Sequence, residues 1–301
     1  MSIIHLYKAP EFFTLEGVKG KKICAMEKIH GTSAWIQYSD GKITYHGGSE
    51  KGEDFKRLFN EEKLLDSFRK SGYTHVRVHG EAYGGKQQGM KSTYGDTLKF
   101  VCFDVRVDFN YFLDLVDAIN FVKTLGLDFV PYVIGNCDPE WLQTQAELPS
   151  IQAIRNNMGP CRSREGIVVK PLVELKMSDG SRAIFKHKNA KFWETKNPRR
   201  LGKSLKLYEG FDIITDEWVT KMRGIHVADK MLRERESKSF TIKDTSTFID
   251  ALIADIKKES EGEIQWTKED DPEYEHLLIV RMRKCAGKIA EEVLKNEATT
   301  F

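Results

Sequence analysis

Three lysines stand where a lysine could do covalent or phosphate chemistry. Lys28 follows the apolar run that begins at Ile23, and it precedes Gly31, whose missing β-carbon lets the backbone approach a ligand closely. A lysine amine attacks only when it is neutral, so a nucleophilic lysine needs burial or neighbouring positive charge. Lys186 and Lys188 could supply that charge on one face of a strand, since alternate side chains share a face. Lys28 is therefore the candidate nucleophile, and the lysine pair could bind phosphate oxygens.

Two carboxylates and one aromatic ring complete the candidate set. Glu81 ends an alternating segment just before a glycine-rich loop, and Glu165 directly precedes Gly166. Such carboxylates could hold magnesium or a ribose hydroxyl, and Phe103 could cover a base. Each residue alone has an ordinary structural interpretation, because charged side chains usually lie at the surface and phenylalanines in the core. Together they meet the needs of nucleotidyl transfer, in which a lysine attacks the α-phosphate of a nucleotide and pyrophosphate leaves.

The elements that must position these residues follow from periodicity. Alternation and short apolar runs predict strands at 23–26, 35–38, 43–45, 75–81, 98–107, 166–170 and 183–188. Asp40-Gly41 between the second and third of these is a strong hairpin signal. Helical spacing predicts one helix from 55 to 68 that stops before Gly72, a second from 112 to 125, and a third that starts at Asp138-Pro139.

The character of the chain changes after Gly210, where alternating patterns end. Thr215-Asp216-Glu217 predicts the start of one helix, and apolar spacing predicts two more around 248–256 and 278–293. The sequence therefore predicts an α+β domain of antiparallel sheets with flanking helices over residues 1–208. A small all-α domain over residues 209–301 is expected to follow it.

Composition limits the classes of function. The 301 residues are 40% hydrophobic and 31% charged, and their formal net charge is only +2, so any nucleic-acid surface must be a local patch. One such run is Lys186, Lys188, Lys191, Lys196, Arg199 and Arg200. Five scattered cysteines without a Cys-x-x-Cys pair indicate a reducing compartment and disfavour disulfides and structural zinc. With no signal-like start and no membrane-length apolar run, the expectation is a soluble, intracellular, cytoplasmic protein.

Five segments, in order and in approximate spacing, resemble the signature motifs of covalent nucleotidyltransferases, the superfamily of polynucleotide ligases and messenger-RNA capping enzymes. The first is closest to the version in RNA ligases of the phage T4 RNA ligase 2 type, which includes the kinetoplastid RNA-editing ligases. The five segments are Glu27-Lys28-Ile29-His30-Gly31-Thr32, His79-Gly80-Glu81, Val101-Cys102-Phe103-Asp104-Val105, Arg164-Glu165-Gly166-Ile167-Val168 and Ala183-Ile184-Phe185-Lys186-His187-Lys188. Each is weak alone, but five in the right order form a strong signal.

The resemblance implies a fold and a set of roles. The fold is a nucleotidyltransferase (ATP-grasp-like ligase) domain, and the catalytic residues are Lys28, Glu165, Lys186 and Lys188. The resemblance implies that Lys28 forms the phosphoramide with AMP, Glu81 contacts the ribose, Phe103 stacks on adenine, Glu165 engages the metal or the nucleophile region, and Lys186 and Lys188 contact the α-phosphate. The predicted ATP and AMP contacts also include Glu27, Ile29, Gly31 and Gly48. Phe100 is an alternative stacking residue, and Lys86 and Lys191 are candidates for RNA contact.

One departure concerns the segment after the first hairpin. Where the family often carries an arginine, this chain has His46-Gly47-Gly48-Ser49-Glu50-Lys51, and Arg57 lies far into the next predicted helix. The backbone of Gly48 could still approach the ribose, but the contact normally made by arginine has no clear replacement.

The resulting hypothesis is an ATP-dependent RNA ligase that joins 3′-hydroxyl and 5′-phosphate RNA ends through lysyl-AMP and AMP-capped RNA. ATP is its substrate, Mg²⁺ or Mn²⁺ its cofactor, and a nicked RNA duplex its expected partner, with no membrane partner and a monomeric state. Because several proteins of the resembled family are phage-encoded, a phage origin is compatible with it. The alternatives are a DNA nick ligase and a non-catalytic RNA-binding scaffold; a capping guanylyltransferase is disfavoured because the tail is predicted to be helical rather than an oligonucleotide-binding barrel.

Overall fold

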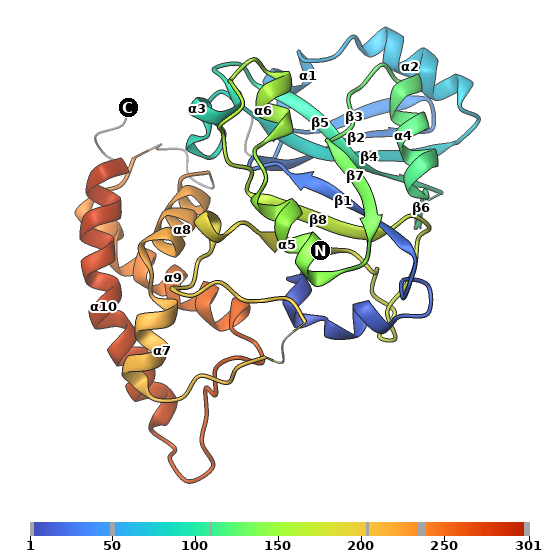
Figure 1. Ribbon diagram of the computed structural model, residues 1–301. Helices are drawn as coiled ribbons and strands as arrows, with labels where there is room; N and C mark the ends of the chain where they lie inside the picture. Colours follow the sequence, from blue (N-terminus) through green and yellow to red (C-terminus); the bar gives the residue numbers. More distant parts are fainter. Residues whose placement is uncertain (1–2, 49–51, 109, 203–204, 234–238, 298–301) are drawn as a thin grey trace. The chain divides into compact units, whose positions relative to one another are not determined.

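The computed structural model describes residues 3–48, 52–108, 110–202, 205–233 and 239–297. The chain forms two compact units, Met1–Lys191 and Phe192–Phe301 (Figure 1). Each unit has its own hydrophobic cluster, so each is described by itself. The predicted domain boundary at 208/209 stays a prediction, and the compact units divide earlier along the chain.

The first sheet of the N-terminal unit has four antiparallel strands in the order β7-β1-β8-β9. Its strands are β1 (Lys22–Lys28), β7 (Tyr132–Asn136), β8 (Gly166–Pro171) and β9 (Phe185–Lys188). The register sets Lys28 opposite Gly166, and Gly166 opposite Lys188. Strand pairing alone therefore gathers three segments that lie far apart in the sequence.

The second sheet is also antiparallel, in the order β3-β2-β4-β5-β6. Its strands are β2 (Thr32–Ser39), β3 (Lys42–His46), β4 (His75–Tyr83), β5 (Lys99–Val107) and β6 (Tyr111–Phe112). The predicted hairpin is confirmed: Asp40 and Gly41 both have positive φ angles, 50° and 80°, as a two-residue turn of the type I′ class requires. The sequence did not predict β6 or β7, because two residues are too few for a pattern and three consecutive residues of β7 are exposed.

Short helices cover the sheets of the N-terminal unit. They are α1 (Gly52–Lys56), α2 (Glu61–Lys70), α3 (Lys91–Tyr94), α4 (Leu115–Thr124), α5 (Pro139–Glu147) and α6 (Ile151–Arg155), with 3₁₀ turns at Leu6–Lys8, Pro10–Thr14, Gln87–Gly89 and Ala190–Phe192. The single helix predicted from 55 to 68 is wrong. Asn60 interrupts it, because its side chain caps a new helix by accepting a hydrogen bond from the backbone N–H of Lys63 at 3.0 Å.

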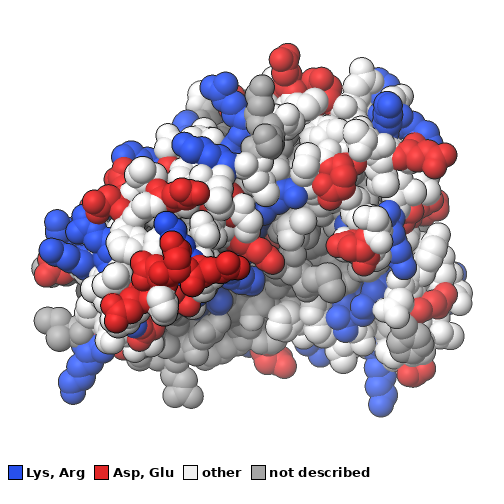
Figure 2. All heavy atoms as spheres, turned by 90° about the horizontal axis from the view of Figure 1, so that it is seen from below, with Lys and Arg blue, Asp and Glu red and all other residues white. Residues whose placement is uncertain are grey.

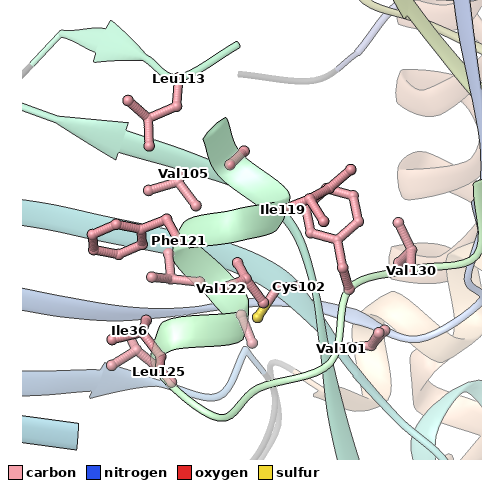
Figure 3. Packing of buried hydrophobic residues seen from close by; sticks show 14 of the residues in the cluster. Ile36, Val101, Cys102, Val105, Leu113, Ile119, Phe121, Val122, Leu125 and Val130 are labelled. Carbon is pink, nitrogen blue, oxygen red and sulfur yellow. The ribbon is translucent and has the colours of Figure 1, made fainter. Parts of the chain in front are cut away.

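The hydrophobic core joins α4 to the second sheet (Figure 3). Ile119 and Val122 on α4 lie with Val105 of β5 in one cluster, which also contains Met26 of β1. On the same sheet Tyr38 stacks on Phe68 of α2, with ring centroids 5.2 Å apart. Full burial of one such side chain contributes about 1.5–3 kcal/mol, so this cluster fixes the strands that carry the site.

In the described part of the C-terminal unit the secondary structure is helical, which confirms the predicted fold class. The helices are α7 (Phe211–Trp218), α8 (Lys221–Arg233), α9 (Thr245–Glu259) and α10 (Tyr274–Glu297), with a 3₁₀ turn at Ile242–Asp244. The predicted start at Thr215 is wrong, because the first helix begins at Phe211. Gly224 lets α8 pack closely on α10, since a β-carbon there would lie 2.6 Å from a methyl carbon of Ile289.

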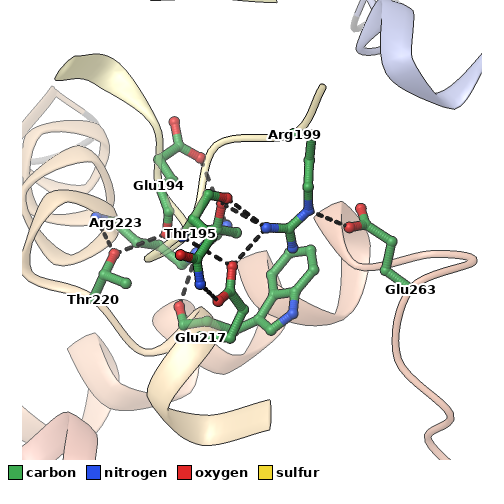
Figure 4. A network of polar contacts seen from close by, with 9 residues as sticks. Glu194, Thr195, Arg199, Glu217, Thr220, Arg223 and Glu263 are labelled. Atoms are coloured by element: carbon green, nitrogen blue, oxygen red, sulfur yellow. Dashed lines mark hydrogen bonds and ion pairs between the residues drawn. The ribbon is translucent and has the colours of Figure 1, made fainter. Parts of the chain in front are cut away.

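A buried ionic network holds the start of the C-terminal unit together (Figure 4). Arg199 donates to Glu217 Oε1 at 2.5 Å and to Glu263 Oε2 at 2.6 Å, and its side chain is 9% exposed. Lys196 pairs with Asp216. Arg199 was predicted to belong to a basic run that meets nucleic acid; the structure instead places it in the interior of this unit, where its charge is neutralised.

Charges on the surface are mixed. Figure 2 shows basic and acidic side chains interspersed on the face that it draws, in keeping with the small net charge. Within the described ranges, no helix is both long and apolar enough to cross a lipid bilayer.

Candidate active site

The candidate nucleophile lies at the end of a central strand. Lys28 is the last residue of β1, and its side chain is 24% exposed. Its Nζ donates to Glu165 Oε2 at 2.6 Å. Glu165 directly precedes β8, and its side chain is 5% exposed. The structure therefore brings together two residues that stand 137 positions apart in the sequence.

Lys188 completes this group from β9. Its Nζ lies 3.8 Å from Glu165 Oε1, so one carboxylate stands between two ammonium groups. Burial alone would raise the pKa of Glu165, but attraction to Lys28, and then to His30 and Lys188, outweighs burial and lowers that pKa to about 2. Glu165 is therefore charged at neutral pH. Two ammonium groups beside one carboxylate suit a site for phosphate.

Gly166 makes this arrangement possible. Its φ angle is 153°, and a β-carbon there would lie 2.2 Å from the carbonyl oxygen of His187 and 2.7 Å from the Cα of Lys188. A side chain would push β8 away from β9 and separate Glu165 from Lys188. Lys186, two residues before Lys188, shares its face of β9, as predicted.

The loop after the nucleophile is held by hydrogen bonds from three directions. The N–H of His30 donates to the hydroxyl of Tyr94 at 3.3 Å, and the N–H of Gly31 donates to Glu81 Oε1 at 3.2 Å. The carbonyl of Gly31 accepts from Gln88 Nε2 at 3.1 Å. A β-carbon on Gly31 would lie 2.3 Å from a backbone oxygen, so only glycine fits.

The glycine-rich segment after Glu81 forms one side of this clamp. Gly84, Gly85, Gln88 and Gly89 all have positive φ angles, which turn the chain back toward the nucleophile loop. Gln87, 3% exposed, accepts a hydrogen bond from the Thr32 hydroxyl at 2.7 Å. Sequence reasoning missed these glutamines and Tyr94, because a polar residue in a loop carries no pattern. The run of glycines was the one available signal.

Gly48 also lies close to the nucleophile loop. With φ of 68°, it packs so tightly on β2 that a β-carbon would lie 2.1 Å from Cγ2 of Thr32. The neighbouring positions 49–51 lie outside the described residues. Arg57, the arginine considered as a replacement for the family's usual one, pairs with Asp54 at 3.0 Å on an exposed part of α1 and its flank.

Two predicted nucleotide contacts have other structural roles. Both carboxylate oxygens of Glu27 face the start of α6: they accept from the Ser150 hydroxyl at 2.5 Å and from the N–H groups of Ile151 and Gln152 at 2.9 and 3.1 Å. Ile29 is 4% exposed and belongs to the hydrophobic core. Their contacts with nucleotide stay predictions, and for Glu27 the side chain is already engaged elsewhere.

The two phenylalanines of β5 are distinguished by a β-bulge. The register shifts from His79 opposite Asp104 to Gly80 opposite Cys102, so Phe103 is the extra, unpaired residue. Its half-buried ring packs against the edge of the core. Phe100 instead makes edge contacts with rings of α1 and its flank, 5.2 and 5.7 Å between centroids, on the helix-covered face. Phe103 therefore stays the candidate for stacking on a base.

The two candidates for RNA contact lie at the surface. Lys86 is exposed, and so is Lys191, whose Nζ donates to the Ser163 hydroxyl at 3.0 Å. Among the described side chains, no three His, Cys, Asp or Glu residues are grouped as a metal site.

The RNA ligase family model matches residues 21–188, which is more than half of the chain. This chain belongs to the RNA ligase family. The match spans all the segments that form the Lys28 site, from β1 to β9. The predicted family is therefore confirmed. Members of this family are ligases that act on RNA.

Solved structures of RNA ligase from Naegleria gruberi resemble this chain more distantly. A K170A mutant with ATP and Mn and a K170M mutant with AMP and Mn are each 20% identical, with TM-scores of 0.49. The similarity covers 64% of this chain and 56% of theirs, so this chain spans little more than half of their length. A search of curated proteins found no match.

Proposed function

We propose that this protein is an ATP-dependent RNA ligase that works through a covalent lysyl-AMP intermediate. The observation that carries the proposal is the junction of β1, β8 and β9, where Lys28, Glu165 and Lys188 meet at 2.6 and 3.8 Å. A partly exposed lysine with a second ammonium group nearby suits attack on a phosphate. The same three strands lie within the family match.

In the first step the Lys28 ammonium gives one proton to solvent, and the lone pair of the neutral amine attacks the α-phosphorus of ATP. The amine gives a second proton to solvent once it is bonded to phosphorus. The P–N bond forms as the bond from the α-phosphorus to the bridging oxygen breaks, and pyrophosphate leaves. Glu165, which stays a carboxylate because of its low pKa, orients the lysine before attack. Lys186 and Lys188 stabilise the negative charge that develops on the phosphoryl oxygens.

The nucleotide is placed by residues of the second sheet. Glu81 contacts the ribose while it also holds the nucleophile loop, and Phe103 stacks on adenine from its bulge. The backbone of Gly48 approaches the ribose without a side chain in the way. These contacts explain why glycines and a bulge, rather than regular strand residues, line this part of the unit.

A divalent cation fits this site as a partner of the nucleotide. Glu165 is a carboxylate beside the nucleophile, and phosphate and water would supply the other ligands of the ion. Mg²⁺ or Mn²⁺ bound there would neutralise phosphate charge as pyrophosphate leaves.

The later steps join RNA ends. A 5′-phosphate oxygen of RNA attacks the phosphorus of lysyl-AMP, the P–N bond breaks, and AMP caps the RNA. An RNA 3′-hydroxyl then attacks the 5′-phosphorus, the phosphodiester forms, and AMP leaves. We propose a nicked RNA duplex as substrate, with Lys86 and Lys191 contacting its phosphates and the helical C-terminal unit helping a monomeric enzyme to engage it.

The test is incubation of the purified protein with α-labelled ATP and Mg²⁺, beside Lys28→Ala, with label counted on the denatured polypeptide. Label on the wild type alone is the expected result. Absence of label with Mg²⁺ and with Mn²⁺, and also with labelled GTP and NAD, would overturn the proposal in favour of a non-catalytic RNA-binding protein. If label forms, competition between nicked RNA and nicked DNA substrates decides whether the protein seals RNA or DNA.

A further inference from the structure

A second cluster of cations lies on the second sheet, outside the nucleotide site. Arg77 of β4 and Arg106 of β5 stand directly opposite each other in the strand register. Side chains in that relation have Cβ atoms only about 4.5–5.5 Å apart, and like charges so placed destabilise a sheet. The pKa of Arg77 is lowered, first by burial and second by the charge of Arg106.

The described part of the protein supplies no counter-charge in contact with this pair. Among the described residues, neither guanidinium lies within ion-pair distance of a carboxylate. The contrast with Arg182 and Arg199 is clear, because each of those pairs with two carboxylates. An arrangement that leaves two half-buried guanidinium groups without counter-charge is suited to an external anion.

One of the two guanidinium groups is held in place. Arg77 Nε donates to Gln37 Oε1 at 2.7 Å, and the guanidinium carbon lies 4.3 Å from the ring centroid of Trp35. Trp35 in turn stacks beside the exposed His46, with ring centroids 5.3 Å apart and an interplanar angle of 18°. The Trp35 ring and Gln37 thus hold the half-buried guanidinium of Arg77 in one orientation.

The cluster is continuous with the active-site face. Arg77, His79 and Glu81 are alternate residues of β4 and therefore share one face of the sheet. At about 3.3 Å per residue, Arg77 lies about 13 Å along the strand from Glu81.

We infer that Arg77 and Arg106 bind backbone phosphates of the RNA substrate, on the face of the second sheet that leads away from Glu81. The inference rests on the proposed RNA substrate and adds a contact surface to it. Arg77, oriented by Gln37 and Trp35, and Arg106 from the next strand bridge phosphate oxygens. The contact is to the backbone, so it adds affinity without selecting a base sequence.

Arg106 gives the cleaner test, because among the described residues it makes no hydrogen bond that its replacement would break. Binding of a fluorescent nicked RNA duplex is measured by anisotropy across a salt series for the wild type, Arg106→Gln and Arg106→Lys. Arg69→Gln, an exposed arginine of α2, is the charge-matched control. Thermal melting of each variant, together with label uptake from ATP without RNA, checks that the unit is folded.

Arg106→Gln is expected to bind RNA about 5- to 10-fold more weakly at ~0.1 M salt, and to reduce the slope of log affinity against log salt by about one. Arg106→Lys should keep most of the slope. Equal affinity and slope for Arg106→Gln and Arg69→Gln, or no RNA binding by the wild type, would overturn the inference. If the wild type takes no label from ATP, the proposed ligase function is wrong. The comparison of RNA binding would still decide whether Arg77 and Arg106 contact RNA.

Discussion

Two lysines on the same face of the first sheet each pair with a carboxylate, yet their surroundings differ. Lys28 pairs with Glu165 at 2.6 Å and is 24% exposed, whereas Lys170 pairs with Asp104 at 3.1 Å and is 1% exposed. Lys170 stands opposite Cys24, four residues before Lys28 on β1. The same strand pairing therefore positions both ammonium groups, which differ in burial and in the charged groups around them.

The buried pair is balanced by further charges. Lys170 also lies 3.4 Å from Glu174, and Arg182 joins both Asp104, at 2.8 Å, and Glu174. Two acids thus meet two bases, and the pair ties β8 of one sheet to β5 of the other. At Lys28 the site is partly open: the Lys28 side chain is 24% exposed, and Glu165 also lies 3.8 Å from Lys188. Buried charges that pair with one another indicate a structural role, whereas a partly exposed lysine at a strand end indicates a place for substrate.

The largest expected effect is at Lys28. Lys28→Arg keeps a positive charge beside Glu165, but a guanidinium stays protonated and cannot attack phosphorus. We expect loss of label uptake from ATP by more than about 1,000-fold, on the scale of removing a covalent nucleophile. Unfolding in urea should change little. Label retained by the arginine variant at a tenth of the wild-type rate or more would mean that another group is the nucleophile.

Lys170 should behave in the opposite way. Lys170→Ala leaves Asp104 buried with only part of its counter-charge, so we expect the free energy of unfolding to fall by about 3–5 kcal/mol. Urea unfolding measures this. Adding Asp104→Asn should restore part of the loss, since it removes the buried unpaired charge. If Lys170→Ala is as stable as the wild type, the structural role assigned to this pair is wrong.

The charge of Glu165 makes the free energy of unfolding depend on pH. Its pKa is about 2 in the folded protein, against an ordinary value of 4.5, so its charge stabilises the fold. A depressed folded pKa gives stability that is fully present above pH 4.5 and is lost as pH falls from 4.5 toward 2. The wild type should exceed Glu165→Gln by up to ~3 kcal/mol near neutral pH. Unfolding measured from pH 7 to pH 3 should show this difference shrink; a constant difference would contradict the assignment.

The smallest expected effect concerns the clamp on the nucleophile loop. Gln88→Ala removes one hydrogen bond to the carbonyl of Gly31, which is worth about 1 kcal/mol, so adenylylation should slow about 5-fold. Gln145→Ala on α5 is the matched control, because its backbone rather than its side chain accepts from Arg164. Rates of label uptake at saturating ATP measure the effect. Equal slowing in both variants would show that the hydrogen bond from Gln88 to Gly31 does not assist adenylylation.

Much of the fold could be predicted because its signals are local. The hairpin at Asp40-Gly41 needs positive φ angles that this pair supplies, and Asp138 caps α5 by accepting from the N–H of Trp141 at 2.8 Å. Alternation predicted the strand that carries Glu81, and a short apolar run predicted the strand that leads into Lys28. The prediction of one helix across Asn60 was wrong, because the Asn60 side chain caps a new helix at that point.

Residue types and motif order determined by themselves the family, the fold class and the candidate lysines. Only the tertiary structure decided which charged groups meet: strand register set Lys28 against Glu165, turned Glu27 toward α6, and placed Arg199 inside the C-terminal unit. The physical reason is that a carboxylate or guanidinium has the same sequence signature whether it binds substrate or a buried partner. Its role depends on burial and on neighbours that lie far away along the chain.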